Sequence, residues 1–176
     1  MASDSGATSI LSAVKAGLSG GGSIIHSHSD KGDDTIVIKA DDVLEVMRFL
    51  KEDEAIDFSM MMDLTVVDYL GNEDLQPYLR GLKTRFEVVY HLYSMGKNHR
   101  LRVKAPVTQE NCEINSVTSI WLAANWFERE AWDLYGVKFR GHPDLRRILL
   151  YEEFEGHPLR KDFPKKGRQP LLGPRN

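Results

Sequence analysis

Apolar residues recur at spacings of three and four positions in two segments of the N-terminal half. Residues 10–18 show this spacing and are followed by a triple glycine at 20–22, which lacks the residue order of a phosphate-binding loop. Residues 43–50 show it after Asp41 and Asp42, either of which can cap a helix. The pattern predicts a short helix, a glycine-rich linker and a second, amphipathic helix.

Alternation of apolar and polar residues predicts the strands. A brief strand is expected at 36–38 and a long one at 58–66, and segments 86–92 and 101–105 are expected to form a hairpin around the turn at 96–98. Because the two strands of a hairpin run in opposite directions, the sheet should be antiparallel. The predicted fold class is α+β, with an antiparallel sheet, helices packed on it and an extended C-terminal arm.

The same alternation predicts which side chains face the core. Met60 and Met62 share a face with the apolar residues of their strand, so they are expected to pack in the core rather than bind a soft metal. Glu87 and three basic residues of the hairpin are expected to face solvent. The basic residues are Arg100, Arg102 and Lys104.

An apolar-rich segment from Val117 to Tyr135 contains all three tryptophans and predicts a long helix. Ser116 is a suitable N-terminal cap and Gly136 a suitable C-terminal cap. The segment is apolar on more than one face, which indicates a helix that is buried on both sides or shared with a partner. The pattern allows a break near Trp126, and no period continues beyond Gly136.

Length and composition fit one globular domain with tails. The 176 residues are expected to divide into an N-terminal helix and glycine-rich linker at 1–33, an α+β domain at 34–155 and an extended basic docking tail at 156–176. Cys112 is the only cysteine, which excludes an internal disulfide and an iron–sulfur cluster bound by several cysteines of this chain. The sequence contains neither a membrane-spanning apolar stretch nor a secretory signal, so we expect a cytoplasmic protein.

Charge is segregated along the chain, although the net charge is only −3. Residues 30–74 contain fourteen acidic against four basic residues, a balance of −10, whereas residues 156–176 contain six basic residues against Asp162 alone, a balance of +5. Ordering about 20 residues of this tail costs roughly 20–30 kcal/mol, which requires on the order of 1,000 Å² of apolar burial. The tail is therefore expected either to be disordered alone or to lie across a partner that covers Phe163 and the tail leucines.

Four charged residues of the predicted helix invite a chemical interpretation. Glu128 and Glu130 lie about 200° apart on a helical wheel, so they face away from each other and do not form a carboxylate pair. Arg129 and Asp133 are one turn apart and are expected to form an ion pair with a structural or interfacial role. A hydrolase that uses Glu130 and Asp133 stays an alternative hypothesis.

The histidines lack the spacing of a zinc site. His142 and His157 each precede a proline, which favours extended backbone over the helix that an HExxH motif requires. His26 and His28 would share one side of an extended segment, but no third ligand is close in sequence. We therefore expect no catalytic residue, metal ligand or cofactor site on this chain.

An RNA-binding module is a second alternative. Arg100, Arg102 and Lys104 alternate along one strand, as basic residues do on sheets that bind RNA, and the basic tail could add contacts. Such sheets also expose aromatic residues for base stacking, and Tyr93 is the only candidate in the hairpin. The pattern alone favours no nucleic-acid partner.

One spaced series of residues matches a known family signature at every position. Its members are Glu128, Arg129, Glu130, Asp133, Leu134, Tyr135, His142, Arg146, Ile148 and Leu149. A second motif at 156–164 includes His157, Arg160, Lys161, Asp162 and Phe163. Through these residues the chain resembles the 30 kDa subunit family of proton-pumping NADH:quinone oxidoreductase, respiratory complex I. The resemblance is strong from about Ser116 onward and diffuse over residues 34–106.

The resemblance implies a structural subunit in the peripheral arm of that complex, on the cytoplasmic side of the bacterial plasma membrane and attached to the membrane only through the complex. NADH, flavin, iron–sulfur clusters and quinone are implied to bind to other subunits. The extended C-terminal segment is implied to wrap on the neighbouring quinone-site subunit, with the signature residues structural or interfacial. Related subunits of membrane-bound hydrogenases, deazaflavin-dependent dehydrogenases and the ferredoxin–plastoquinone complex stay open as alternatives.

Overall fold

The computed structural model describes residues 10–18, 23–72, 76–80, 82, 84–166 and 169. Its elements follow in the order α1 (Ile10–Leu18), β1 (Ile24–Asp30), β2 (Asp33–Ile38), η1 (Ala40–Asp42), α2 (Val43–Glu52), β3 (Met60–Asp68), η3 (Pro77–Leu79), β4 (Thr84–Ser94), β5 (His99–Thr108), β6 (Glu113–Asn115), α3 (Ala124–Tyr135) and β7 (Lys138–Arg140). A five-stranded sheet in the order β1-β2-β5-β4-β3 forms the centre, and β6 and β7 form a separate pair.

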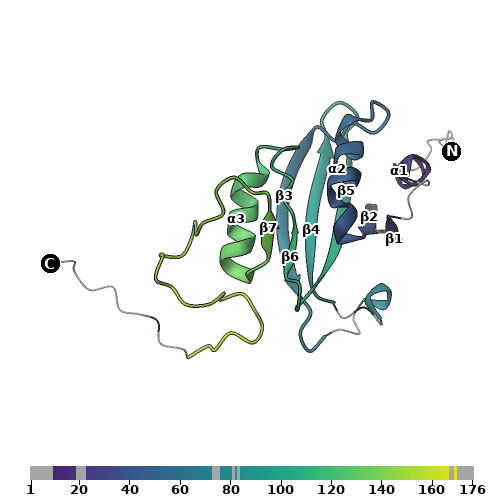
Figure 1. Cartoon of the computed structure of the whole chain (residues 1–176). Coiled ribbons are helices and arrows are strands. Elements are labelled where there is room, and N and C mark those ends of the chain that lie inside the picture. The colour runs from purple at the N-terminus through teal and green to yellow at the C-terminus, as the bar shows by residue number, and fades with distance from the viewer. Residues whose placement is uncertain are drawn as a thin grey trace.

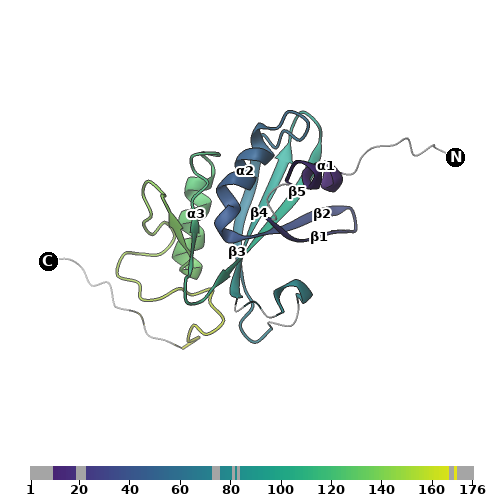
Figure 2. The same ribbon diagram turned by 45° about the vertical axis from the view of Figure 1, so that its right-hand side comes forward.

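The helices are arranged on one face and at one edge of the sheet. α2 lies across one face, and α3 packs beside the edge strand β3 (Figures 1 and 2). α1 lies near the other edge, in contact with β1, β2 and α2. Neighbouring strands of the central sheet are antiparallel except β2 and β5, which run parallel. The predicted α+β fold with an antiparallel sheet and packed helices is confirmed, with one parallel pair added.

The core lies between α2 and the sheet. The buried stripe of α2 consists of Val43, Val46, Met47 and Leu50, which are inaccessible to solvent. They meet the inward residues of the hairpin, among them Phe86, Val88, Tyr90 and Leu92. Each large apolar side chain buried in this way contributes roughly 1.5–3 kcal/mol to folding, so the stripe accounts for the position of α2. Asp42 stands at the N-cap of α2, as expected, but its side chain makes no capping bond.

The inward positions of β3 differ from the predicted ones. A bulge between Met61 and Asp63 shifts the alternation, so Met61 and Leu64 are buried while Met60 and Met62 are 45% and 43% exposed. The prediction that Met60 and Met62 are core residues is wrong. The extra residue in the bulge reverses the face on which every preceding side chain of the strand lies.

Glu87 also departs from the prediction, because it is completely buried instead of facing solvent. Its carboxylate accepts hydrogen bonds from the hydroxyls of Tyr69 and Tyr78, each at 3.0 Å, and pairs with Lys104 Nζ at 3.0 Å. Tyr78 lies on η3, which covers this part of the sheet. A buried carboxylate requires such partners, and a long-range loop supplies them here.

Segment 1–33 contains a strand that the sequence did not predict. β1 is mostly polar and forms the outer edge of the sheet against β2, so it shows no apolar alternation. Its backbone pairing places His26 and His28 with ring centroids 5.5 Å apart. The predicted helix at 10–18 is confirmed as α1, whereas the glycines at 20–22 lie outside the described residues.

The predicted helix from Val117 to Tyr135 is confirmed only in its second half. α3 begins at Ala124, close to the allowed break near Trp126, and the preceding residues form turns in which Ser116 Oγ accepts the N–H of Thr118 at 3.2 Å. Beyond the helix, β7 pairs in parallel with β6, although a strand of three residues is too short to show a period. The tertiary partner determines that strand.

Candidate functional site

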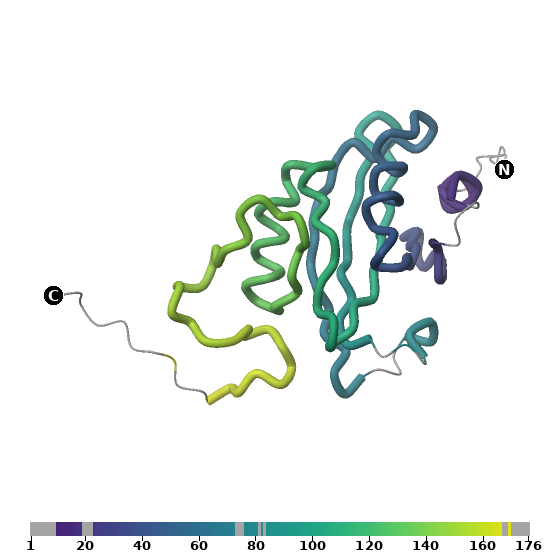
Figure 3. Tube along the Cα trace, in the orientation of Figure 1, coloured from purple at the N-terminus to yellow at the C-terminus, as the bar shows by residue number. Residues whose placement is uncertain are grey.

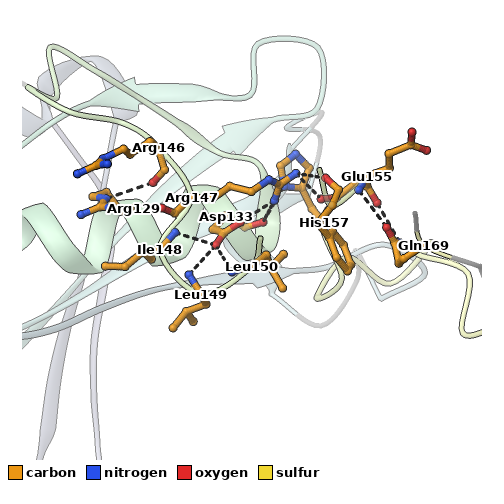
Figure 4. A network of polar contacts seen from close by, with 12 residues as sticks. Arg129, Asp133, Arg146, Arg147, Ile148, Leu149, Leu150, Glu155, His157 and Gln169 are labelled. Atoms are coloured by element: carbon orange, nitrogen blue, oxygen red, sulfur yellow. Dashed lines mark hydrogen bonds and ion pairs between the residues drawn. The ribbon is translucent and has the colours of Figure 1, made fainter. Parts of the chain in front are cut away.

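The signature residues converge on Asp133, which lies on α3 with no solvent exposure. Its Oδ1 pairs with Arg147 Nη1 at 2.6 Å, and its Oδ2 accepts the N–H groups of Ile148, Leu149 and Leu150 at 3.1, 2.9 and 2.9 Å (Figure 4). Burial opposes ionisation, but the loop N–H groups together with Arg147 lower the pKa of the Asp133 carboxyl below its usual value. One ionised carboxylate therefore fixes the loop 146–150 against α3.

The predicted ion pair between Arg129 and Asp133 is wrong. Arg129 instead donates from Nε to the carbonyl of Arg146 at 3.2 Å and from Nη2 to the carbonyl of Arg147 at 3.1 Å. The signature residue Arg146 points to the exposed Asp144 at 2.9 Å. Helical spacing brings Arg129 near Asp133, but the loop offers that carboxylate three N–H groups and a better placed guanidinium.

Arg147 is the functional residue that sequence reasoning missed. Besides Asp133, its guanidinium donates to the carbonyls of Phe154 at 2.7 Å and Gly156 at 3.2 Å. It also lies 5.8 Å from the ring centroid of Trp132 and 5.7 Å from that of Phe154. Nothing in the local sequence separates Arg147 from its neighbour Arg146, since both occupy an irregular segment without a period.

The first part of the predicted tail folds back onto the domain. The chain passes around α3 after β7 and then beneath it, toward the ends of β3 and β4 (Figure 3). His157 Nδ1 lies 2.9 Å from the Asp133 carbonyl, and Arg160 donates from Nε to the Tyr135 carbonyl at 2.5 Å. Residues 167, 168 and 170–176 of the tail lie outside the described residues.

A second ionic network ties the tail to the sheet. The guanidinium of Arg85 pairs with Asp68 at 2.8 Å and with Asp162 at 2.7 Å, and the backbone N–H of Lys161 donates to Asp68 at 2.9 Å. The two carboxylates raise the pKa of Arg85, and bonding to Arg85 lowers the pKa of Asp162. Asp68 continues the inward parity of β3 after Leu64 and Val66, and an acid at a core position is a signal that a buried partner exists.

Gly136 allows the tail to approach the end of α3. Its φ of 76° forms the left-handed C-terminal cap, as predicted. A Cβ atom at this position would lie 2.4 Å from Arg160 Nη2 and 2.5 Å from His157 Cδ2. A side chain here would therefore oppose both the cap and the packing of the second motif.

Glu128 lies on the opposite side of α3 and is also buried. Its Oε1 accepts the N–H of Val117 at 2.7 Å, and among the described residues its Oε2 and the buried hydroxyl of Tyr90 have no hydrogen-bond partner. Burial raises the pKa of Glu128 to about 7, against the weaker opposing effect of hydrogen bonds from Ser116 and Val117. Glu128 thus anchors the turn before α3 and holds a proton at mildly acidic pH.

The arrangement offers little for the hydrolase hypothesis. Glu130 is exposed, whereas both Asp133 oxygens are occupied by the loop and Arg147, so the two carboxylates do not share a site. His142 accepts the N–H of Asp144 at Nδ1 (3.0 Å), which leaves Nε2 to donate to the Asn125 carbonyl at 3.1 Å. Among the described residues no three His, Cys, Asp or Glu side chains are grouped to hold a metal ion.

Removing the Asp133 carboxylate should destabilise the protein strongly. Asp133→Ala leaves three loop N–H groups and Arg147 without their acceptor, so we expect the free energy of unfolding to fall by about 3–5 kcal/mol. Urea denaturation followed by tryptophan fluorescence measures this change. Glu130→Ala, on the exposed side of the same helix, is the matched control and should change stability by about 0.5 kcal/mol or less. Equal effects of the two substitutions would contradict the role assigned to Asp133.

Glu128 should make stability depend on pH. Because its folded-state pKa of about 7 exceeds the usual value of 4.5, its stabilisation is complete below pH 4.5 and is lost as the pH rises through 7. Relative to Glu128→Gln, which keeps the acceptor for Val117, the free energy of unfolding of the parent chain should fall by about 3 kcal/mol between pH 4.5 and pH 8. Parallel pH profiles of the two proteins in urea denaturation would refute this assignment.

Comparison with known proteins gives a consistent result. Residues 36–169 match the family described as respiratory-chain NADH dehydrogenase, 30 Kd subunit. The corresponding NADH-quinone oxidoreductase subunit of Geotalea uraniireducens (strain Rf4) is 42% identical over 153 residues, which is 86% of each chain. Its counterpart in Caulobacter vibrioides (strain ATCC 19089 / CIP 103742 / CB 15) is 49% identical over 136 residues, 77% of this chain and 64% of that protein.

Two solved structures share the fold. A trypsin-resistant fragment (1–134) of Nqo5 superimposes with a TM-score of 0.63 and 32% identity, over 77% of this chain and 96% of that chain. A chain of an archaeal respiratory membrane complex, the membrane-bound sulfane sulfur reductase, has a TM-score of 0.70 at 23% identity, over 89% of this chain and 86% of that chain, which shows the fold alone. With a family match across most of its length and relatives above 40% identity, the chain belongs to the 30 kDa subunit family of the respiratory-chain NADH dehydrogenase.

Proposed function

We propose that this chain is the non-catalytic, structural 30 kDa subunit in the peripheral arm of a proton-pumping NADH:quinone oxidoreductase. It braces the quinone-site subunit and is needed for assembly of the complex that couples NADH oxidation and quinone reduction to proton translocation. Flavin, iron–sulfur clusters, NADH and quinone bind to other subunits. Relatives at 42–49% identity that are named as NADH-quinone oxidoreductase subunits support this assignment over the related hydrogenase and dehydrogenase complexes.

The observation that carries the proposal is the use to which the signature residues are put. Asp133, Arg129 and His157 direct their polar atoms to the backbone of the segment 146–157 or to α3, and Asp162 is bound to Arg85. Their spacing in the signature therefore serves to shape and hold a surface segment. A reactive centre would instead keep polar atoms available to a substrate.

An apolar surface beside this segment supports a docking role. Leu122, Trp126 and Leu149 are 89%, 69% and 60% exposed, and Arg129 belongs to the same helix and bonds to the loop that carries Leu149. Exposed tryptophan and arginine are the residue types that most often dominate binding energy at protein interfaces. A subunit that is covered by neighbours in its complex can carry such residues without aggregation.

The RNA-binding alternative loses its main support. Lys104 pairs with the buried Glu87, and Arg102 pairs with Asp33 at 3.3 Å. Arg100 lies over the ring of Tyr93, 4.8 Å from its centroid, so that aromatic face is already covered. The basic row that suggested RNA binding is largely neutralised within the sheet.

The chain is proposed to lie on the cytoplasmic side of the plasma membrane and to reach the membrane only through its complex. No helix among residues 10–18, 23–72, 76–80, 82, 84–166 and 169 is long and apolar enough to cross a bilayer. One structural neighbour belongs to a respiratory membrane complex, which agrees with this type of attachment.

Deletion of residues 156–176 should prevent incorporation into the complex while the sheet, α2 and α3 stay folded. The reason is that the segment following Gly156 carries the contacts proposed to fix the docking arm. Affinity isolation of the complex, with subunits quantified by mass spectrometry, measures incorporation, and circular dichroism verifies folding. Deletion of residues 1–9, outside the family match, is the control. Normal incorporation of the C-terminal truncation would refute the docking role.

Trp126→Ala should weaken assembly without weakening the fold. The side chain is mostly exposed, so stability should change by about 0.5 kcal/mol or less, whereas loss of an interface tryptophan costs about 2 kcal/mol or more, roughly 30-fold in affinity. Met95→Ala, equally exposed at the hairpin turn, should leave assembly unchanged. The measurement is the fraction of the variant found in the isolated complex, and equal fractions for both variants would argue against an interface at Trp126.

A further inference from the structure

A groove runs along the described part of the tail. It has a volume of about 750 Å³, and its lining includes Phe154, Phe163, Pro158 and Pro164. The rings of Phe154 and Phe163 are stacked, with centroids 6.0 Å apart and an interplanar angle of 18°. Gly156 permits this stacking, because a Cβ there would lie 2.9 Å from a Phe163 ring carbon. The floor of the groove is therefore aromatic and apolar.

The rim of the groove is positively charged. Lys161 and Lys165 line it and are exposed, and in the part of the chain that the structure describes neither ammonium group is ion-paired. Arg160 adds a third cation, although its guanidinium is bonded to the Tyr135 carbonyl. No carboxylate belongs to the described lining: Asp162, between the lysine and the phenylalanine of the motif, turns away to Arg85.

The groove is preformed. Bonding of Asp162 to Arg85 and of the Lys161 N–H to Asp68 fixes the backbone on both sides of the Lys161 side chain. Arg147 holds the carbonyls of Phe154 and Gly156 on the opposite wall. Binding in such a groove requires little further ordering of the protein, which favours affinity.

We propose that this groove binds an acidic segment of a neighbouring subunit, with one apolar side chain of that segment on the Phe154 and Phe163 floor and its carboxylates facing Lys161 and Lys165. Charge complementarity selects an anionic occupant, and the apolar floor and the volume exceed what a lone phosphate group fills. The inference rests on the proposed function, since it names the chemistry of the partner that meets the docking arm.

The double charge reversal Lys161→Glu with Lys165→Glu tests this in the intact complex. Incorporation of the variant should fall at least about tenfold, because two attractive contacts become repulsive. Lys161→Arg with Lys165→Arg should retain incorporation. Lys31→Glu with Lys97→Glu, at exposed turns away from the groove, changes the net charge equally and should also be incorporated normally.

Circular dichroism of each isolated variant separates a folding defect from a docking defect. If the reversed variant is poorly folded, Lys161→Gln with Lys165→Gln replaces it, and the expected result is a smaller loss of incorporation. Normal incorporation of a folded groove variant, with loss of incorporation on deletion of 156–176, would overturn the groove and leave the proposed function standing. Normal incorporation of both would overturn the two together.

A lipid headgroup is the competing anionic occupant. Sedimentation of the purified chain with phosphatidylglycerol vesicles, abolished by the double reversal while incorporation stays normal, would assign the groove to the membrane surface and refute the acidic segment. Absence of vesicle binding together with the expected loss of incorporation would support the proposal.

Discussion

The buried carboxylate of Asp133 is the interaction on which the C-terminal half of the molecule depends. A carboxylate without contact with water must be neutralised and hydrogen-bonded, or it becomes protonated. Here the Arg147 guanidinium and three consecutive N–H groups supply those partners. Because the N–H groups belong to one irregular loop, satisfying the charge determines the path of the chain after β7. An irregular segment obtains in this way a defined conformation without a hydrogen-bonded ladder.

The ionic cluster of Arg85, Asp68 and Asp162 repeats this arrangement at a greater distance along the chain. Asp162 is separated from Arg85 by 77 positions, and Lys161 from Asp68 by 93. With Arg147 at one end and Arg85 at the other, the segment from the loop to Phe163 is held at both ends. For a subunit whose proposed role is to present a surface, fixing the shape of that segment is the relevant property, and chemical reactivity is not.

Three carboxylates of α3 show how environment assigns different roles to one type of group. Glu128, which faces the turn before the helix, is buried with a single backbone donor, so burial keeps its pKa high. Asp133, with four donors, is held in the ionised form despite equal burial. Glu130, between them in sequence, lies on the exposed face. Interpreting the helix as a catalytic carboxylate cluster would treat as equivalent three groups that the fold has separated by solvation.

Local patterns of residues were sufficient to predict the α+β class, the hairpin of β4 and β5, the stripe of α2 and the cap at Gly136, because each follows from a short period or a local backbone requirement. The spacing of the signature was sufficient to predict the family. The pairing of Asp133 with Arg147, the burial of Glu87 and the bulge that turns Met60 outward became visible only in the folded chain. These features depend on which distant segment supplies a partner or on where a strand gains an extra residue. A period of two or 3.6 residues carries no information about contacts between segments far apart in the chain.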